Sequence, residues 1–240
     1  MTQKSIVVDQ FPLTATQEAM LVGALRRGPQ FELHQIVVEL EPEVDVIRLR
    51  AAWEFAAQRH AVLRARFKWL DVPAPVHEVV QHVDVAIKVV IADSVEEYLD
   101  SDRKLGIDLA EWPGFRLALI ELAGRAPVLV FTHHHVMLDG TAQKLLLEDV
   151  FAHYDNHGVV ESHDTPQFRD HCVAFAARDR DAERRYFQEL LSGAVTTTFP
   201  RPRRHIARNS GHAELADCIE LTAELRGVGA SMGSVLQAAW

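Results

Sequence analysis

The sequence predicts an α/β protein of the α+β type, in which helices flank a mixed, largely antiparallel sheet. Three observations lead to this class. Residues 45–60 have the apolar period of a helix, and residues 115–122 and 128–133 are two apolar, β-prone runs joined by a short loop. A second helical pattern begins after Asp139 and Gly140. Strands and helices therefore alternate, but without the strict strand–helix–strand order of a parallel sheet.

The first elements are two helices with recognisable ends. Thr14 and Gln17 have the spacing of a capping box, and Gly28 followed by Pro29 ends the helix that this box opens. Asp45 is a suitable N-cap for the next helix. The apolar face of that second helix carries Leu49, Ala52, Trp53, Ala56 and His60, so we expect His60 to be a packed core histidine.

Strand patterns follow these helices. Residues 63–69 alternate apolar and basic side chains, which is typical of a half-buried strand. Ser94 and Glu97 have the spacing of another capping box before a short helix. Residues 115–122 and 128–133 are expected to pair as antiparallel strands. The helix after Asp139 has a broad apolar face that comprises Leu145, Leu146, Leu147, Val150, Phe151 and Tyr154.

The composition of the chain changes after about residue 156, where a polar connection begins. Residues 168–191 then have the pattern of one long, charged helix. We therefore expect an N-terminal lobe over residues 1–165, and over residues 166–240 a connecting helix and the beginning of a second lobe.

Two more elements are expected near the end of the sequence. Residues 212–221 are β-type, and residues 229–240 begin an apolar helix that has no terminal cap. Because the sequence stops at Trp240 inside this helical pattern, we expect the second lobe to be incomplete.

Charge and composition exclude several classes of protein. The chain has 25 Lys+Arg against 34 Asp+Glu, a net charge of −9, which disfavours nucleic-acid binding. No apolar run reaches the ~18 residues that a membrane-spanning helix needs, and the N-terminus lacks the pattern of a secretory leader. Cys172 and Cys218 do not form a disulfide framework. These features predict a cytoplasmic protein with no nucleic-acid or membrane partner.

Chemically active side chains are densest in residues 132–140. Along a strand, alternate side chains point to opposite faces, so His133 and His135 share one face and His134 takes the other. The histidines could simply end an edge strand. In a second interpretation, one imidazole is a neutral base near pH 7 and Asp139 braces its loop. In a third, less favoured one, His133, His135 and Asp139 bind a metal ion.

Residues 134–140, His-His-Val-Met-Leu-Asp-Gly, resemble the HHxxxDG signature of the condensation domains of nonribosomal peptide synthetases. These domains belong to a superfamily that includes chloramphenicol acetyltransferase. Residues 11–20 resemble the opening motif of the family, and Arg59-His60-Ala61-Val62-Leu63-Arg64 resembles its RHxxLR motif. Residues 106–116 and 168–175 resemble two further motifs, in the order that the family has.

The resemblance implies a chloramphenicol acetyltransferase-like lobe. It covers essentially the whole chain but only the first half of such a domain, because about a hundred residues follow the motif and the later family motifs do not occur. In the family, two similar lobes form a V, with the active site in a tunnel between them. This chain would then supply the N-terminal lobe and the first elements of the second.

The resemblance also implies the reaction, which is amide formation between a carrier-bound acyl or peptidyl thioester and an aminoacyl thioester. The implied catalytic-site residues are His134, His135, Asp139 and Gly140, with Arg59 and Arg64 as structural support. By resemblance His135 is the catalytic histidine, either as a base for the amine or as a group that orients the amine and stabilises the tetrahedral intermediate. Asp139 would brace the loop through an ion pair. Gly140 would let the backbone approach the reacting centre.

The implied partners are peptidyl or acyl carrier proteins, adjacent synthetase domains and the missing C-terminal lobe. No tightly bound cofactor and no metal are expected, because the phosphopantetheine arms arrive on the carriers. Two alternatives stay open. The chain could be a freestanding acyltransferase that uses acyl-CoA or a carrier, or an inactive half-domain that only binds a carrier or a partner lobe.

Overall fold

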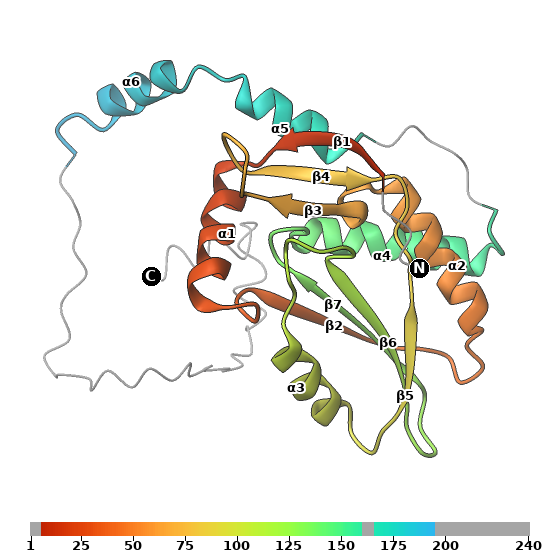
Figure 1. Ribbon diagram of the computed structural model, residues 1–240. Helices are drawn as coiled ribbons and strands as arrows, with labels where there is room; N and C mark the ends of the chain where they lie inside the picture. Colours follow the sequence, from red (N-terminus) through yellow and green to blue (C-terminus); the bar gives the residue numbers. More distant parts are fainter. Residues whose placement is uncertain (1–5, 160–165, 195–240) are drawn as a thin grey trace, which may run out of the picture. The chain divides into compact units, whose positions relative to one another are not determined.

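The computed structural model describes residues 6–159 and 166–194 (Figure 1). The chain divides into two compact units, Met1–Phe187 and Gln188–Trp240, and the elements that form the site all lie in the first. The lobe boundary expected at residue 165 stays a prediction. The strand and helix patterns expected over residues 212–221 and 229–240 lie outside the described residues.

The larger sheet confirms the predicted mixed, largely antiparallel architecture. Its strand order is β2 (Leu33–Glu39), β7 (Val128–His134), β6 (Phe115–Glu121) and β5 (Ile87–Ile91). β7 is antiparallel to both of its neighbours, as expected for β6 and β7, whereas β5 runs parallel to β6. The two central strands, β6 and β7, are therefore held by hydrogen bonds on both sides.

A second, smaller sheet was not expected from the sequence. β1 (Val7–Pro12), β4 (Val76–Val80) and β3 (Ala65–Lys68) form an antiparallel three-stranded sheet, with β4 in the middle. The strand predicted over residues 63–69 was partly wrong, because the 3₁₀ helix η1 (Ala61–Arg64) occupies its start.

The side chain of Arg64 accounts for this difference. Its guanidinium donates to the carbonyl oxygens of Ala57, in the preceding helix, and of Val80, in β4, so the turn between that helix and β3 is tied to both. Leu63 is fully buried at the same turn. The alternating pattern thus correctly predicts β3, whereas Leu63 and Arg64, just before it, belong to the 3₁₀ turn.

Four helices surround the larger sheet: α1 (Ala15–Arg27), α2 (Val46–Arg59), α3 (Val95–Leu105) and α4 (Gly140–Asp155). The predicted N-caps of the first three are confirmed. Thr14 forms a complete capping box with Gln17, Asp45 accepts the Arg48 N–H, and Ser94 accepts the Glu97 N–H.

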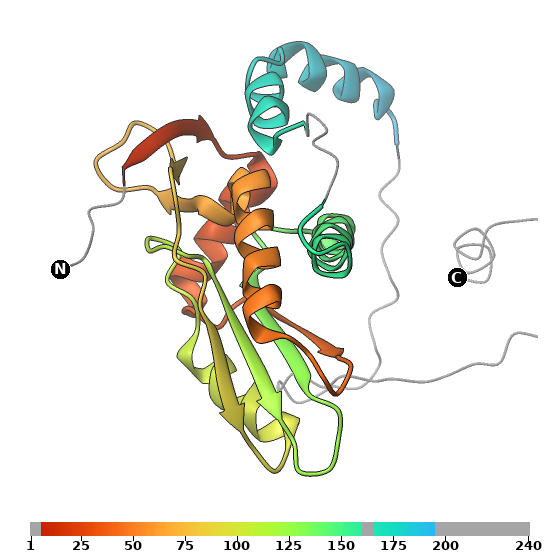
Figure 2. The same cartoon turned by 90° about the vertical axis from the view of Figure 1, so that its right-hand side faces the viewer.

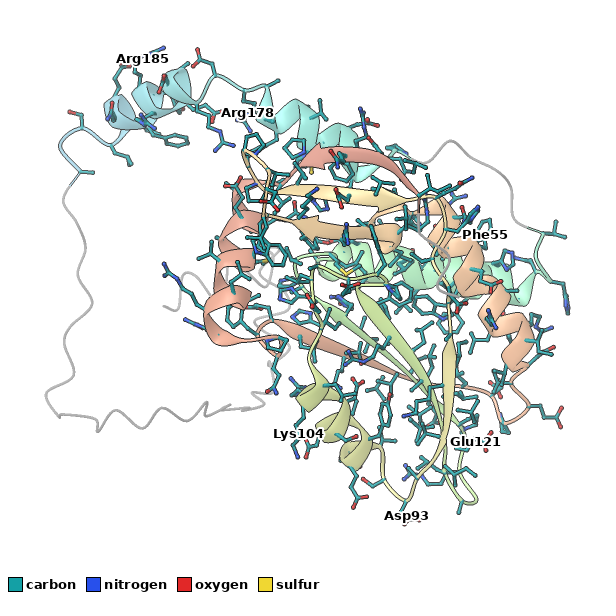
Figure 3. The ribbon with its side chains drawn as sticks, in the orientation of Figure 1. Phe55, Asp93, Lys104, Glu121, Arg178 and Arg185 are labelled. Carbon is teal, nitrogen blue, oxygen red and sulfur yellow. The ribbon has the colours of Figure 1, made fainter. Side chains whose placement is uncertain are left out.

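Both faces of the larger sheet are covered, which explains why β7 is buried along its whole length. On one face Trp53 of α2 contacts Phe131 and Phe115, with ring centroids 4.7 and 6.2 Å apart, and α4 packs beside α2 (Figure 2). On the other face α3 packs on Ala118 and Ile120 of β6. Side chains fill the space between the sheet and these helices (Figure 3).

The prediction of one long helix over residues 168–191 was wrong in one respect. The segment forms two helices, α5 (Phe168–Ala176) and α6 (Arg180–Leu190). Asp179 separates them. Its side-chain oxygen accepts the backbone N–H groups of Asp181 and Ala182, so it acts as the N-cap of a new helix. Among the residues that the structure describes, no helix is long and apolar enough to cross a bilayer.

Candidate active site

The site is built where β7 ends and the chain turns into α4. His133 and His134 are the last two residues at this end of the strand, and both are fully buried. His133 lies opposite His34 of β2 in the ladder, and its ring stacks on Phe131 at 4.8 Å. Burial first, and the neighbouring histidines second, lower the pKa of His133 to about 4, although its ring N–H bond to the His134 carbonyl opposes this shift. His133 is thus a neutral core side chain near pH 7.

His134 points to the opposite face, as the alternation predicts. Its Nδ1 accepts the Val136 N–H at 3.0 Å, which places the ring proton on Nε2. Burial, followed by the nearby His133, lowers its pKa to about 4. Neutral His134 therefore shapes the turn that follows the strand, and it does not line the pocket described below.

His135 is the motif histidine that reaches the pocket. Its backbone N–H donates to the Glu32 carbonyl at 2.8 Å, which continues the β2–β7 pairing beyond His134. Its Nδ1–H donates to the Leu138 carbonyl at 3.0 Å. This bond assigns the proton to Nδ1 and leaves the Nε2 lone pair free to accept a proton. No other described residue forms a hydrogen bond with the His135 ring.

The sequence analysis did not single out His34, which lies against His135. The two imidazoles stack with centroids 4.3 Å apart and an interplanar angle of 18°. Gln143 of α4 donates to His34 Nδ1 at 3.2 Å. Burial first, then the nearby His135, lowers the pKa of His34. The feature that points to His34 is its cross-strand pairing with His133. The sequence analysis missed it because β2 was not predicted.

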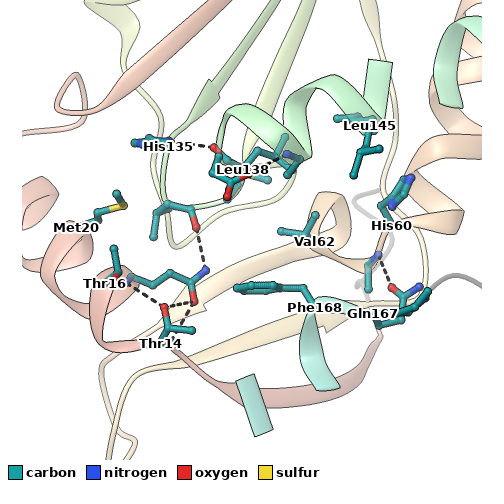
Figure 4. A pocket seen from close by; sticks show the side chains of 18 residues that line it. Thr14, Thr16, Met20, His60, Val62, His135, Leu138, Leu145, Gln167 and Phe168 are labelled. Carbon is teal, nitrogen blue, oxygen red and sulfur yellow. Dashed lines mark hydrogen bonds between the residues drawn. The ribbon is translucent and has the colours of Figure 1, made fainter. Parts of the chain in front are cut away.

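The pocket beside His135 has a volume of about 490 Å³ and is formed by α1, η1, the turn after β7, α4 and the start of α5 (Figure 4). Its walls are mainly apolar, with a few hydroxyl, amide and imidazole groups. The lining includes Met20, Val62, Met137, Leu138, Leu145, Leu146 and Phe168, together with Thr14, Thr16, Gln17, His60, His135 and Asp139. A mainly apolar wall with two imidazoles, those of His60 and His135, can hold an apolar chain beside a few polar groups.

Gln17 was not expected to be a site residue, yet it ties α1 to the turn beside His135. Its side chain is buried, and its amide N–H donates to the Val136 carbonyl at 2.9 Å. Its amide oxygen accepts from the Thr14 backbone N–H at 3.1 Å and from His77 Nε2 at 3.3 Å. The capping-box spacing identified Gln17 only as a local cap, because its long-range bond cannot be read from spacing.

Asp139 is the N-cap of α4, and its Oδ1 accepts the Ala142 N–H at 2.8 Å. No cation of the described residues lies within ion-pair distance of Asp139, so the ion pair that the resemblance implies is not formed among them. Gly140 is the first residue of α4, and a Cβ built on it meets no described atom within 4 Å. Crowding by these residues therefore does not explain the glycine, and its role toward substrate stays a prediction.

The metal-site interpretation finds no support in these contacts. Among residues 6–159 and 166–194, no three histidine, cysteine or carboxylate side chains come together as a ligand set. Each proposed ligand also has another bond: Nδ1 of His133 and of His135 lies at hydrogen-bond distance from a backbone carbonyl, and Asp139 caps a helix.

The expected support residues, Arg59 and Arg64, do not line the pocket themselves but flank the η1 residues that do. Arg64 donates to backbone carbonyls at the η1 turn, and burial lowers its pKa. Arg59 Nε lies 3.0 Å from Asp149 Oδ2 of α4. His60 was expected in the core. It is only half-buried, lines the pocket and places Nε2 2.6 Å from the same Asp149 oxygen.

Comparisons with known proteins identify the family and the fold of the chain. The family model described as Condensation domain matches residues 7–240. The chain is 30% identical to the chondramide synthase cmdD of Chondromyces crocatus, over 71% of this chain and 5% of that protein. It is 31% identical to the nonribosomal peptide synthetase ecdA of Aspergillus rugulosus, over 84% of this chain and 3% of that one.

Among solved structures, the fold is similar to the condensation domain of the Monacolin K polyketide synthase MokA. The TM-score is 0.68 at 20% identity, and the match covers 81% of this chain and 46% of the other. The chain thus spans a small part of the curated relatives and about half of the solved chain.

Proposed function

Because the chain belongs to the condensation-domain family, we propose that it takes part in amide bond formation, with a carrier-bound acyl or peptidyl thioester as donor and an aminoacyl thioester as acceptor. Carrier proteins would deliver both substrates on phosphopantetheine arms, and adjacent synthetase domains and a C-terminal lobe would complete the machinery. The observation that carries this proposal is the state of His135, which lines the pocket with Nδ1–H donated to Leu138 and a free Nε2 lone pair.

The proposed step balances without a metal or redox cofactor. The acceptor amine attacks the thioester carbonyl, a C–N bond forms, and a tetrahedral intermediate results. His135 Nε2 takes the proton that the amine loses, and the C–S bond then breaks. The departing thiolate of the donor arm accepts the proton from His135, which returns the imidazole to its starting state. Holding both tethered substrates together lowers the barrier further.

The other site residues have supporting roles in this proposal. His134 is neutral and holds the turn through the Val136 N–H, and Asp139 begins α4. Gly140 keeps the N-terminus of α4 open toward substrate. Arg59 binds Asp149 of α4 and Arg64 binds carbonyls at the η1 turn, so together they hold η1 where it lines the pocket.

The proposal is tested with the longest natural polypeptide that carries this sequence. Donor and acceptor carriers are loaded, and mass spectrometry measures the amide product on the acceptor arm. We expect His135→Ala to lower the rate by a factor of roughly 10² to 10⁴, the usual worth of a general base. His82→Ala is the matched control, because His82 is exposed and Gln58 is the one hydrogen-bond partner of its ring among the described residues.

Two results would contradict the proposal. Condensation at the wild-type rate by a folded His135→Ala variant would remove His135 from the reaction. Product formation from free acyl-CoA, with none from carrier-bound donors, would indicate a freestanding acyltransferase instead.

A further inference from the structure

His135 is held on one side by β2 and by Glu32, the residue just before that strand. Glu32 accepts its backbone N–H, and His34 covers one face of its ring. The bond from Nδ1 to Leu138 fixes one edge of the ring. With the Leu138 hydrogen bond alone, the His135 ring could still rotate about the axis of that bond. The His34 ring, stacked at a centroid distance of 4.3 Å, blocks this rotation. The stack therefore restricts the motion that the hydrogen bond leaves free.

His34 is itself held in place. The Gln143 amide donates to its Nδ1 at 3.2 Å, so the His34 proton lies on Nε2. On its other side the His133 ring approaches at 5.6 Å with an interplanar angle of 63°. β2, β7 and α4 thus all contribute to the orientation of this one ring. His34 does not line the pocket, so it reaches the chemistry only through His135.

We propose that His34 is a positioning residue for the condensation reaction, and that its flat ring face holds His135 in the orientation and tautomer with a free Nε2 lone pair. This inference rests on the proposed function for its catalytic meaning. The geometric part concerns two imidazoles of this chain and can be tested without any turnover.

The charges around His34 favour a neutral stack. Burial and His135 lower the pKa of His34, and Arg103 acts in the same direction, while Glu32 opposes them. His133, which faces the other side of His34, is neutral near pH 7 because its pKa is about 4. A neutral ring can stack on His135 without the repulsion that two adjacent imidazolium ions would suffer.

Two substitutions separate the effect of the flat ring face of His34 from the effect of its hydrogen bond with Gln143. His34→Phe keeps a flat ring, and His34→Leu fills a similar volume without one. Both remove the hydrogen bond from Gln143, so any difference between them reports the stack alone. Nitrogen-15 imidazole spectra of the chain near neutral pH give the tautomer of His135, and backbone amide spectra check the fold.

We expect His135 to remain the Nδ1–H tautomer in the wild type and in His34→Phe, and to become a mixture of tautomers in His34→Leu. The matched control is Phe55→Leu, which removes a similar stack at 4.4 Å from His153, away from the pocket, and should leave the His135 signals unchanged. An unchanged His135 tautomer in folded His34→Leu would overturn the proposal. An equal loss of that tautomer in His34→Phe would also overturn it.

Should His34→Leu fail to fold, Gln143→Leu provides a second test, because it frees the ring of His34 but keeps the residue. A partial loss of the His135 tautomer is expected there, and unchanged spectra would contradict the proposal. In the condensation assay, His34→Leu should lower kcat about tenfold with KM unchanged, and His34→Phe should stay near the wild-type rate. If the wild type forms no amide, the proposed function fails, and the spectra still decide the role of His34.

Discussion

Three of the described histidines are buried in neutral form, and each makes stability depend on pH. Burial lowers the pKa of His77, His133 and His134 to about 4, from 6.5 in an exposed histidine. The unfolded chain therefore binds protons that the folded chain rejects, so stability is complete above pH 6.5 and falls as the pH drops toward 4. Urea unfolding across this range should show the decline.

His77→Phe tests whether the buried histidines cause that decline. His77 already stacks on Phe11 at 4.4 Å, so a phenyl ring suits its surroundings. We expect the variant to have a shallower fall of the free energy of unfolding between pH 6.5 and 4. A slope equal to that of the wild type would assign the decline to other groups.

Gln17 should matter well beyond its helix cap. Gln17→Leu leaves the Val136 carbonyl and the His77 ring N–H without the bonds that they now share with it. We expect a loss of about 1–3 kcal/mol in the free energy of unfolding, because buried polar groups lose their partners. Gln30→Leu is the control, since the Gln30 amide is exposed where it donates to Lys104. A loss no larger than in this control would argue against the connection.

At the scale of the element, α4 depends on Asp139 for its first turn. Asp139→Ala should cost about 1 kcal/mol of stability, whereas Asp139→Asn should retain most of it, because an amide oxygen can still accept the Ala142 N–H. Chemical denaturation of the two variants measures the difference. Equal losses in both would mean that the charge of Asp139, rather than its cap, stabilises the protein.

The sequence predicts the helices better than the sheets, for a physical reason. Caps and apolar period are local, so Thr14, Asp45 and Ser94 mark helix starts correctly. β2 and β5 are strands because they pair with strands far away in the sequence, and this pairing leaves no local pattern to predict them from. The break between α5 and α6 depends on one cap, Asp179, within an otherwise helical pattern.

The candidate site shows the same division. The motif places His135, and strand alternation correctly separates His134 from His133, because both features lie within one short segment. His34 and Gln17 come from other elements and reach the motif only after folding. Their contributions could not be predicted without the β2–β7 register and the packing of α1.

At the scale of the whole molecule, one buried carboxylate joins four elements. Asp102 of α3 accepts hydrogen bonds from Gln35 of β2, Arg116 of β6 and Thr132 of β7. Burial opposes its ionisation, but these bonds outweigh burial and lower its pKa. The charged form is therefore part of the fold and fastens α3 to the sheet.

Asp102→Ala should destabilise the protein by about 3–5 kcal/mol, because it leaves the partly buried Arg116 without its counter-ion. Asp100→Ala on the same helix is the control, since Asp100 is exposed. Thermal unfolding of both variants checks the prediction. Similar midpoints would show that the carboxylate adds nothing beyond its position on α3.

The placement of β2 at the edge of the described sheet has a kinetic consequence for His135. An edge strand has one neighbour, and such strands open more readily than central ones. When β2 detaches from β7, His135 loses its backbone bond to Glu32 and its ring contact with His34 in the same event. The amide hydrogen of His135 should therefore exchange with solvent at the rate of the β2 amides, faster than those of β6. The position of the His135 imidazole thus depends on an edge strand of its sheet and is lost whenever that strand opens.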